Sequence, residues 1–240
     1  TKLERRFKEF PGLNLTWETR EGIVKHETEY DISDAKDYNP ELRGHLEAQI
    51  ANAADELAYS AHDLDDGLRS GLLSPLMLGD LSLWKILVES VGWKGEELSE
   101  LDRKRIIRRM IGLEVEDLIK ATDQQIQDNS VTSVEELQKL PHNVITFSDE
   151  MASHNRELKD FLFKNLYQNH RVIRMQVKAE GIICDLFNAY QREPLMLPEH
   201  IQARIESVGL ERAICDYIAG MTDRFAVDEH EKIFNPDRRP

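Results

Sequence analysis

Residues 46–71, "LEAQIANAADELAYSAHDLDDGLRSG", carry the clearest structural signal in the chain. Their apolar side chains recur in steps of three and four, which predicts one buried face of an amphipathic helix. The expected buried stripe is Ile50, Ala54, Leu57, Ala61, Leu64 and Leu68. This segment predicts a long helix whose opposite face is free for another role.

The same helix is strongly acidic. Between Gly44 and Leu68 there is no Lys or Arg, whereas Glu47, Asp55, Glu56, Asp63, Asp65 and Asp66 all occur there. Like charges at helical spacing repel, and acids on a helix are usually interleaved with basic residues four positions away. The helix therefore lacks the basic partners that its own sequence would normally supply.

A helical wheel places Asp55, Tyr59, His62 and Asp66 roughly opposite the apolar stripe, with Asp63 at the edge. Two interpretations are open. This face is simply solvated, or it lines a cleft that holds a divalent cation. Carboxylate oxygens and imidazole nitrogens are ligands that Mg²⁺, Mn²⁺, iron or Ni²⁺ accept.

The remaining sequence predicts an all-α protein. Asn39-Pro40 has the pattern of a helix N-cap followed by Pro, so we expect the acidic helix to start there and end near Gly71. The run "NVITF" (143–147) is the one strand-like stretch, or an extended connector. Further helices are expected to start at Asp80 and Ser82, at Ser99 (a long helix running through Leu118) and at Ser133 (a short one). The other expected helices cover residues 3–10, 17–26, 149–168, 170–191, 198–208 and 210–233, and residues 28–38 are expected to form a loop.

Composition limits the function classes. The chain has 31 basic and 45 acidic residues, a net charge of −14, which argues against a general binder of the nucleic-acid backbone. No apolar run of about 18 residues is present, so no membrane span is expected. Cys184 and Cys215 lie among apolar neighbours and are predicted to be buried free thiols of a cytoplasmic protein.

A basic cluster, "RKRIIRRM" (103–110), stands out against this acidic background. The simplest interpretation is an amphipathic helix with a basic face. The alternative is contact with an anionic effector or with single-stranded nucleic acid.

Four segments together resemble the deoxyguanosine triphosphate triphosphohydrolase family of the HD-domain superfamily. They are "NLTWETREGIVKHE" (14–27), residues 46–71, "LYQNHRV" (166–172) and "DYIAGMTDRFA" (216–226). The resemblance implies an HD-type helical bundle with a C-terminal helical extension. Residues 1–72 would belong to the catalytic core, and residues 73–240 would complete the nucleotide pocket and the oligomer contacts.

The resemblance also implies an activity. Family members use a divalent metal (Mg, Mn, Fe, Ni or Zn) to hydrolyse a deoxynucleoside triphosphate to deoxynucleoside and inorganic triphosphate, and they tend to form homo-oligomers. Carried onto this chain, Asp55 is a metal ligand, Tyr59 lies by the α-phosphate and Asp63 bonds the 3′-hydroxyl. Tyr167 packs against C2′ of the sugar, where a ring leaves no room for a ribose hydroxyl.

Further residues are weaker candidates for the triphosphate. Lys159 and Lys164 precede Tyr167 on the same predicted helix, and His170 and Arg171 follow it. Each has a plainer interpretation as a surface side chain. Two roles are open for His26. It contacts the substrate, or it is only a cation at a helix C-terminus, where positive charge is favourable.

The sequence departs from the family pattern at its start. The resemblance places a metal-binding His, a His-Asp pair and a further catalytic His upstream of Asn14, and none is present. A substitute set of His26, His62, Asp63 and Asp216 is set aside, because the resemblance gives Asp63 to the substrate. We expect a C-terminal segment with an incomplete metal site that is inactive alone. The alternatives are a non-catalytic nucleotide-binding, regulatory or assembly subunit, and a helical scaffold whose acidic face is only solvated.

Overall fold

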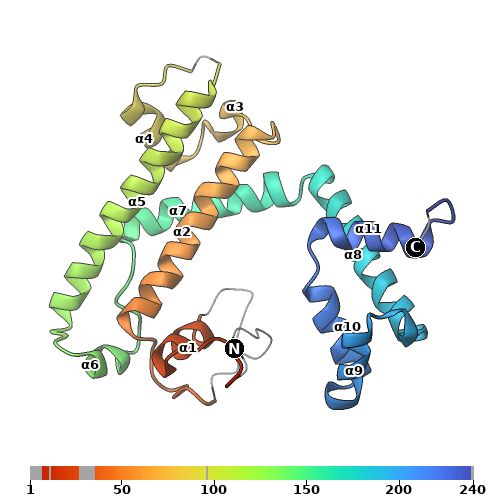
Figure 1. Cartoon of the computed structure of the whole chain (residues 1–240). Helices are drawn as coiled ribbons and strands as arrows, with labels where there is room; N and C mark the ends of the chain where they lie inside the picture. Colours follow the sequence, from red (N-terminus) through yellow and green to blue (C-terminus); the bar gives the residue numbers. More distant parts are fainter. Residues whose placement is uncertain (1–6, 11, 27–35, 96, 239–240) are drawn as a thin grey trace. The chain divides into compact units, whose positions relative to one another are not determined.

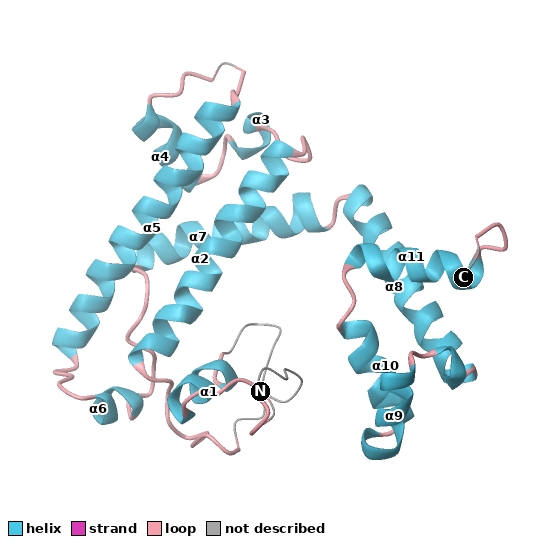
Figure 2. Cartoon of the chain, in the orientation of Figure 1, coloured by secondary structure: helices cyan, strands magenta, loops and turns pink. Residues whose placement is uncertain are grey.

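The computed structural model describes residues 7–10, 12–26, 36–95 and 97–238. Throughout these ranges the chain forms helices, turns and loops, and none of them contains a strand (Figure 2). The all-α prediction is confirmed. None of the described helices is long and apolar enough to cross a membrane.

The chain divides into two compact units, Thr1–Leu166 and Tyr167–Pro240. The functional division expected after residue 72 stays a prediction, because compactness does not test which residues belong to a catalytic core. By packing alone, residues 73–166 belong with the acidic helix.

The first unit is built around two long helices (Figure 1). The acidic helix α2 packs against α5 and α7, α4 packs against α5 and α7, and α1 packs against α2. Its helices are α1 (Trp17–Val24), α2 (Leu46–Arg69), α3 (Pro75–Leu78), α4 (Ser82–Val91), α5 (Glu100–Asp128), α6 (Val134–Gln138) and α7 (Asp149–Leu162). Ser99 caps α5 as its sequence predicts, because the Ser99 hydroxyl accepts a hydrogen bond from the Asp102 amide.

The predicted start of the acidic helix is wrong. Asn39 has a positive φ of 48°, in a turn, and α2 begins six residues beyond Pro40. His45 is the N-cap, where its Nδ1 accepts a hydrogen bond from the Ala48 amide. The residues between Pro40 and α2 form other contacts, since the Arg43 amide donates a hydrogen bond to the Gln138 carbonyl. His45, which lies closer to the apolar stripe, therefore caps the helix in place of Asn39.

Residues 143–147 form an extended connector, as the alternative interpretation had it. Val144 is fully buried, and its amide donates to Gln49 Oε1 at 2.9 Å. Gln49 thus provides from α2 the hydrogen bond that a neighbouring strand would have supplied.

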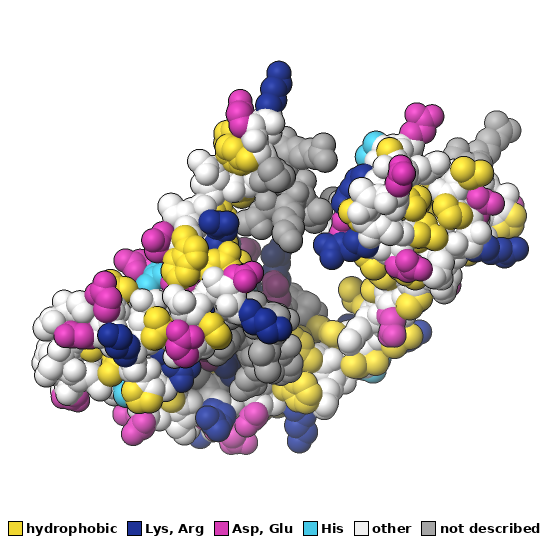
Figure 3. Space-filling model, turned by 90° about the horizontal axis from the view of Figure 1, so that it is seen from below, with side chains coloured by type: hydrophobic (Ala, Val, Ile, Leu, Met, Phe, Trp, Pro, Cys, Tyr) yellow, Lys and Arg dark blue, Asp and Glu magenta, His cyan; other side chains and the backbone are white. Residues whose placement is uncertain are grey.

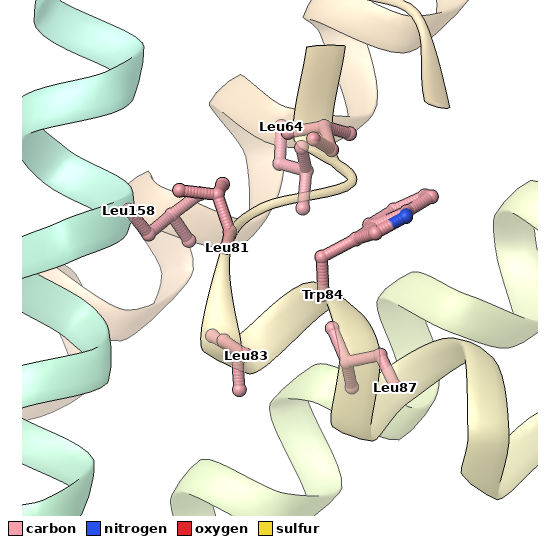
Figure 4. A pocket seen from close by; sticks show the side chains of 7 residues that line it. Leu64, Leu81, Leu83, Trp84, Leu87 and Leu158 are labelled. Atoms are coloured by element: carbon pink, nitrogen blue, oxygen red, sulfur yellow. The ribbon is translucent and has the colours of Figure 1, made fainter. Parts of the chain in front are cut away.

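Leucines of α2, α3, α4 and α7, together with Trp84, form the core at one end of the first unit. They line a small cavity (Figure 4). Its lining is entirely apolar, with no polar group to orient a ligand, so it is a gap in core packing.

The first unit departs from the expected secondary structure near its start and at its end. Phe7–Phe10 are not helical, although their rings stack at 4.8 Å, and the rest of the expected first helix lies outside the described residues. Most of the expected loop at 28–38 also lies outside them. After Leu162, the predicted helix to residue 168 changes to a π-helix at Phe163–Tyr167.

The second unit is a smaller helical bundle. It contains α8 (His170–Arg192), the short 3₁₀ turn Pro194–Met196, α9 (Glu199–Val208), α10 (Leu210–Ala219) and α11 (Asp223–Phe234). Its core surrounds Tyr190, whose hydroxyl donates to Glu229 at 3.0 Å. The expected helix over 210–233 is interrupted by Gly220–Thr222, because Thr222 caps a new helix.

The cysteine prediction is half wrong. Both thiols are free, but both are exposed, because each lies on the outer face of its helix. Charged side chains of both signs are interspersed within each unit on the face shown in Figure 3.

Candidate functional site

Helix α2 carries the candidate site on its solvent face. Asp55, Tyr59, His62 and Asp66 are exposed and Asp63 is half-buried, as the helical wheel predicts. Leu57, Ala61 and Leu64 are buried, but Ile50 and Ala54 are exposed, against prediction. Near its start the helix buries Ala48 and Gln49 instead, because Gln49 is held by the 143–147 connector.

Neighbouring helices provide the basic partners that α2 lacks. Arg103 of α5 forms an ion pair with Asp65, and Lys159 of α7 forms one with Glu56. These contacts explain two of the six acids structurally, Asp65 and Glu56, and Asp55, Asp63 and Asp66 remain on the solvent face.

Asp55 lies beside an imidazole. His26 Nε2 is 3.9 Å from Asp55 Oδ2, and His26 Nδ1 is 2.5 Å from Asn52 Oδ1. Since Asn52 holds one ring nitrogen, the other is turned toward the carboxylate. The Asp55 side chain remains 69% exposed, so it is accessible to a further ligand.

Asp63 is in a different environment two turns further on. Its Oδ2 is buried and has no hydrogen-bond partner among the described residues. Burial, followed by the nearby Asp66 charge, raises the pKa of Asp63 above its ordinary value, while His62 opposes the shift. A buried acceptor without a donor costs free energy, which a hydroxyl group on a ligand would relieve.

Tyr59 lies between these two acids, one turn from each. Burial, and then the Asp63 charge, raise the pKa of its hydroxyl above the ordinary value. The Tyr59 hydroxyl therefore keeps its proton at neutral pH and can donate a hydrogen bond.

The candidate phosphate-binding residues divide between the units. Lys159 is engaged by Glu56, and Lys164 is exposed in the π-helix at the end of the first unit. Tyr167, His170 and Arg171 belong to the second unit, where the Asn169 side chain caps α8 by accepting from the Arg171 amide at 3.0 Å. That these residues join the α2 face stays a prediction.

The substitute ligand set that includes Asp216 gains no support. Both Asp216 oxygens are engaged within the second unit, by Arg204 at 2.6 Å and Arg212 at 2.8 Å. Burial would raise the pKa of Asp216, but the hydrogen bonds from the two arginines bring it below its ordinary value. Asp216 therefore has a structural role between α9 and α10.

The described residues contain no group of three or more His, Cys, Asp and Glu side chains placed to hold a metal ion. They do offer part of one, since an exposed carboxylate with an imidazole at its side is a donor set suited to a divalent transition metal. Asp55 fits the role of one ligand, and the remaining ligands would have to come from elsewhere.

Sequence reasoning missed a buried acid that has no hydrogen-bond partner among the described residues. Glu114 of α5 is fully buried, and neither carboxyl oxygen has a partner among the described residues. Burial, and then the nearby Glu56 charge, raise the pKa of Glu114 to about 8. The only available signal was its i+4 position after Met110 on the inward face of α5, and a Glu there normally predicts a surface residue.

Comparison with known proteins identifies the class. Residues 145–232 match the family described as "Phosphohydrolase-associated domain". This match begins in the 143–147 connector and covers α7 to α11, so it includes parts of both units. This part of the chain is therefore a helical domain of the kind associated with phosphohydrolases.

Full-length relatives narrow the class. The chain is 42% identical over 241 residues to a "Deoxyguanosinetriphosphate triphosphohydrolase-like protein" of Geobacter sulfurreducens, covering 99% of this chain and 63% of the relative. It is 41% identical over 236 residues to a protein of the same description from Deinococcus deserti, covering 98% and 60%. The chain belongs to the deoxyguanosine triphosphate triphosphohydrolase family, and it spans about three fifths of the length of these relatives.

Proposed function

We propose that this chain is part of a metal-dependent hydrolase that converts a deoxynucleoside triphosphate to deoxynucleoside and inorganic triphosphate. The observation that carries the proposal is the solvent face of α2. Asp55, Tyr59 and Asp63 follow one another at four-residue intervals, while the acids Glu56 and Asp65 are neutralised by other helices. The names of the relatives support the same activity.

Asp55 would hold the divalent metal, together with ligands that these residues do not supply. A bound divalent metal supplies Lewis-acid activation of water and neutralises charge at the phosphate. The Asp55 carboxylate is exposed, so binding requires no rearrangement of the core. His26 would keep the carboxylate oriented from one side.

Asp63 and Tyr59 would position the nucleotide. The partnerless Asp63 Oδ2 accepts a hydrogen bond from the 3′-hydroxyl, which fixes the sugar relative to α2. The protonated Tyr59 hydroxyl donates to a non-bridging oxygen of the α-phosphate. In phosphoryl transfer such positioning and charge stabilisation account for most of the catalysis.

Tyr167 would exclude ribonucleotides by occupying the space of a 2′-hydroxyl. Lys164, His170 and Arg171 would neutralise the triphosphate. Lys164 lies within a π-helix, and His170 and Arg171 begin α8. This placement is compatible with a ligand-binding segment, because π-helical turns are frequent at functional sites.

Two variants on the same helix test the proposal in the complete protein. Asp55→Ala is expected to abolish triphosphate release and metal binding while leaving the thermal midpoint unchanged or slightly raised, since a repelling charge is removed. Asp65→Ala is expected to retain activity but to lose about 3 kcal/mol of stability, because Arg103 is left buried and unpaired. Full turnover by Asp55→Ala would contradict the proposed metal site.

A further inference from the structure

Helix α5 has a second face with apolar side chains, which the other described residues leave exposed. Its inner face buries Ile106 and Met110. On the opposite side Val115 is 40% exposed and Ile119 is 63% exposed. We define the outer face of α5 as Arg108, Gly112, Val115 and Ile119, which recur in steps of four, three and four. This spacing is that of a helix packed along another helix.

Gly112 lies at the centre of the outer face. A Cβ atom built at this position would meet nothing within 4 Å. Glycine inside a helix costs about 1 kcal/mol relative to alanine, so the helix itself does not favour it. Since an alanine side chain would also fit, packing among the described residues does not require glycine here. It leaves a notch in the helix surface beside two exposed β-branched side chains.

The charges along α5 are unevenly distributed. Its first half carries Arg103, Lys104, Arg105, Arg108 and Arg109, and its second half carries mainly acids, Glu114, Glu116, Asp117, Asp123 and Asp128. Four of these five basic residues are already paired, Arg103 with Asp65, Lys104 with Glu100, Arg105 with Asp102 and Arg109 with Glu116. Arg108, which lies on the outer face, has no ion-pair or hydrogen-bond partner among the described residues. Asp123 has no cationic partner there, and accepts only from Gln127 at 2.8 Å.

These features are self-complementary when two α5 helices lie antiparallel. We infer that the outer face of α5 binds the outer face of α5 in a second copy of this chain. If the two-fold axis passes between Val115 and Glu116, Ile119 of the second copy fills the notch at Gly112. In the same register Arg108 lies opposite Asp123 of the second copy, so the basic half of each helix faces the acidic half of the other. A parallel arrangement would place like charges together.

This inference gives the basic cluster a role that needs no anionic effector and does not depend on the proposed hydrolysis. Binding of a free anion would use Arg108 but would leave Val115 and Ile119 exposed. Docking of a second copy accounts for the arginine, the glycine and the apolar pair together.

Charge reversal tests the pairing. Self-association of the intact polypeptide is measured by sedimentation velocity over a concentration series, with circular dichroism to confirm the fold. Arg108→Glu and Asp123→Arg are each expected to weaken association by about 30-fold or more, and the double variant to restore it. Ile119→Glu is expected to dissociate this contact fully. Leu76→Glu, at an apolar residue of the same unit that is 92% exposed, is the control and should change nothing.

Three results would overturn the inference. They are a wild-type protein that stays monomeric, an Ile119→Glu variant with unchanged association, and a charge-reversal double variant that is as weak as either single variant. Weakened binding of nucleotides or oligonucleotides by Arg108→Glu with unchanged association would assign the outer face to an anion instead.

Discussion

At the scale of single residues, the six acids of α2 have different roles despite their common sequence environment. Glu56 and Asp65 are structural, because Lys159 and Arg103 reach them from other helices. No periodicity within α2 could have predicted these pairs, because the partners are about 40 and 100 residues away in the sequence. Asp55 and Asp63 could be singled out only by the family resemblance.

The proposed contact between Asp63 and the 3′-hydroxyl can be tested with a nucleotide that lacks this hydroxyl. For a deoxynucleoside triphosphate, Asp63→Ala is expected to lower kcat/KM by about 10- to 100-fold, the value of a hydrogen bond to a charged group. For the matching 2′,3′-dideoxynucleotide the same variant should lower kcat/KM only slightly, because this nucleotide has no 3′-hydroxyl to donate a hydrogen bond. Asp66→Ala, on the same face, serves as the control. Equal losses on both substrates would rule out a contact between Asp63 and the 3′-hydroxyl.

The proposed sugar contact of Tyr167 makes a separate prediction. Tyr167→Ala opens space at C2′, so the ratio of kcat/KM for deoxynucleotides over ribonucleotides is expected to fall by roughly tenfold or more. Tyr167→Phe keeps the ring and should preserve the ratio. The measurement is competitive turnover of a matched dNTP and NTP pair, and an unchanged ratio in Tyr167→Ala would remove the steric role.

At the scale of elements, most helices follow from sequence, and the errors have local causes. Ser99 and Ser133 cap α5 and α6 as predicted, since a serine side chain satisfies the first free amides. The start of α2 was misplaced because His45, an uncommon cap, replaces Asn39. The burial of Gln49 was missed because it depends on the distant connector at 143–147.

Because the Glu114 carboxyl is buried in the first unit, the stability of the folded protein depends on pH. In the unfolded chain its carboxyl ionises near pH 4.5, whereas in the folded protein its pKa is about 8. Between these values the unfolded state has lost a proton that the folded state retains, so stability falls as pH rises by up to about 1.4 kcal/mol per pH unit. Above pH 8 this loss is complete.

Glu114→Gln isolates that contribution, because the amide has the same shape and does not ionise. Urea unfolding at several pH values from 5 to 9 should show the wild type losing more stability than the variant as pH rises to 8. The two curves should run parallel above that value. Parallel curves over the whole range would mean that Glu114 is already ionised in the folded protein.

At the scale of the whole molecule, the sequence predicted the fold class but not the division by packing. The boundary between Leu166 and Tyr167 lies within the π-helix, where the helical pattern in the sequence continues without a break. The exposed thiols of Cys184 and Cys215 were missed for a similar reason, since an apolar neighbourhood in sequence does not tell which side of a helix is covered.

We propose that this chain contributes one face of a triphosphohydrolase site, and that the other metal ligands come from outside these residues. The measurement to make is product analysis by phosphorus NMR, with a deoxynucleoside triphosphate and a divalent metal, for the complete protein and for residues 1–240 alone. We predict inorganic triphosphate as the first product of the complete protein and no turnover by residues 1–240. Release of diphosphate or monophosphate instead, or turnover by residues 1–240 alone, would contradict the account.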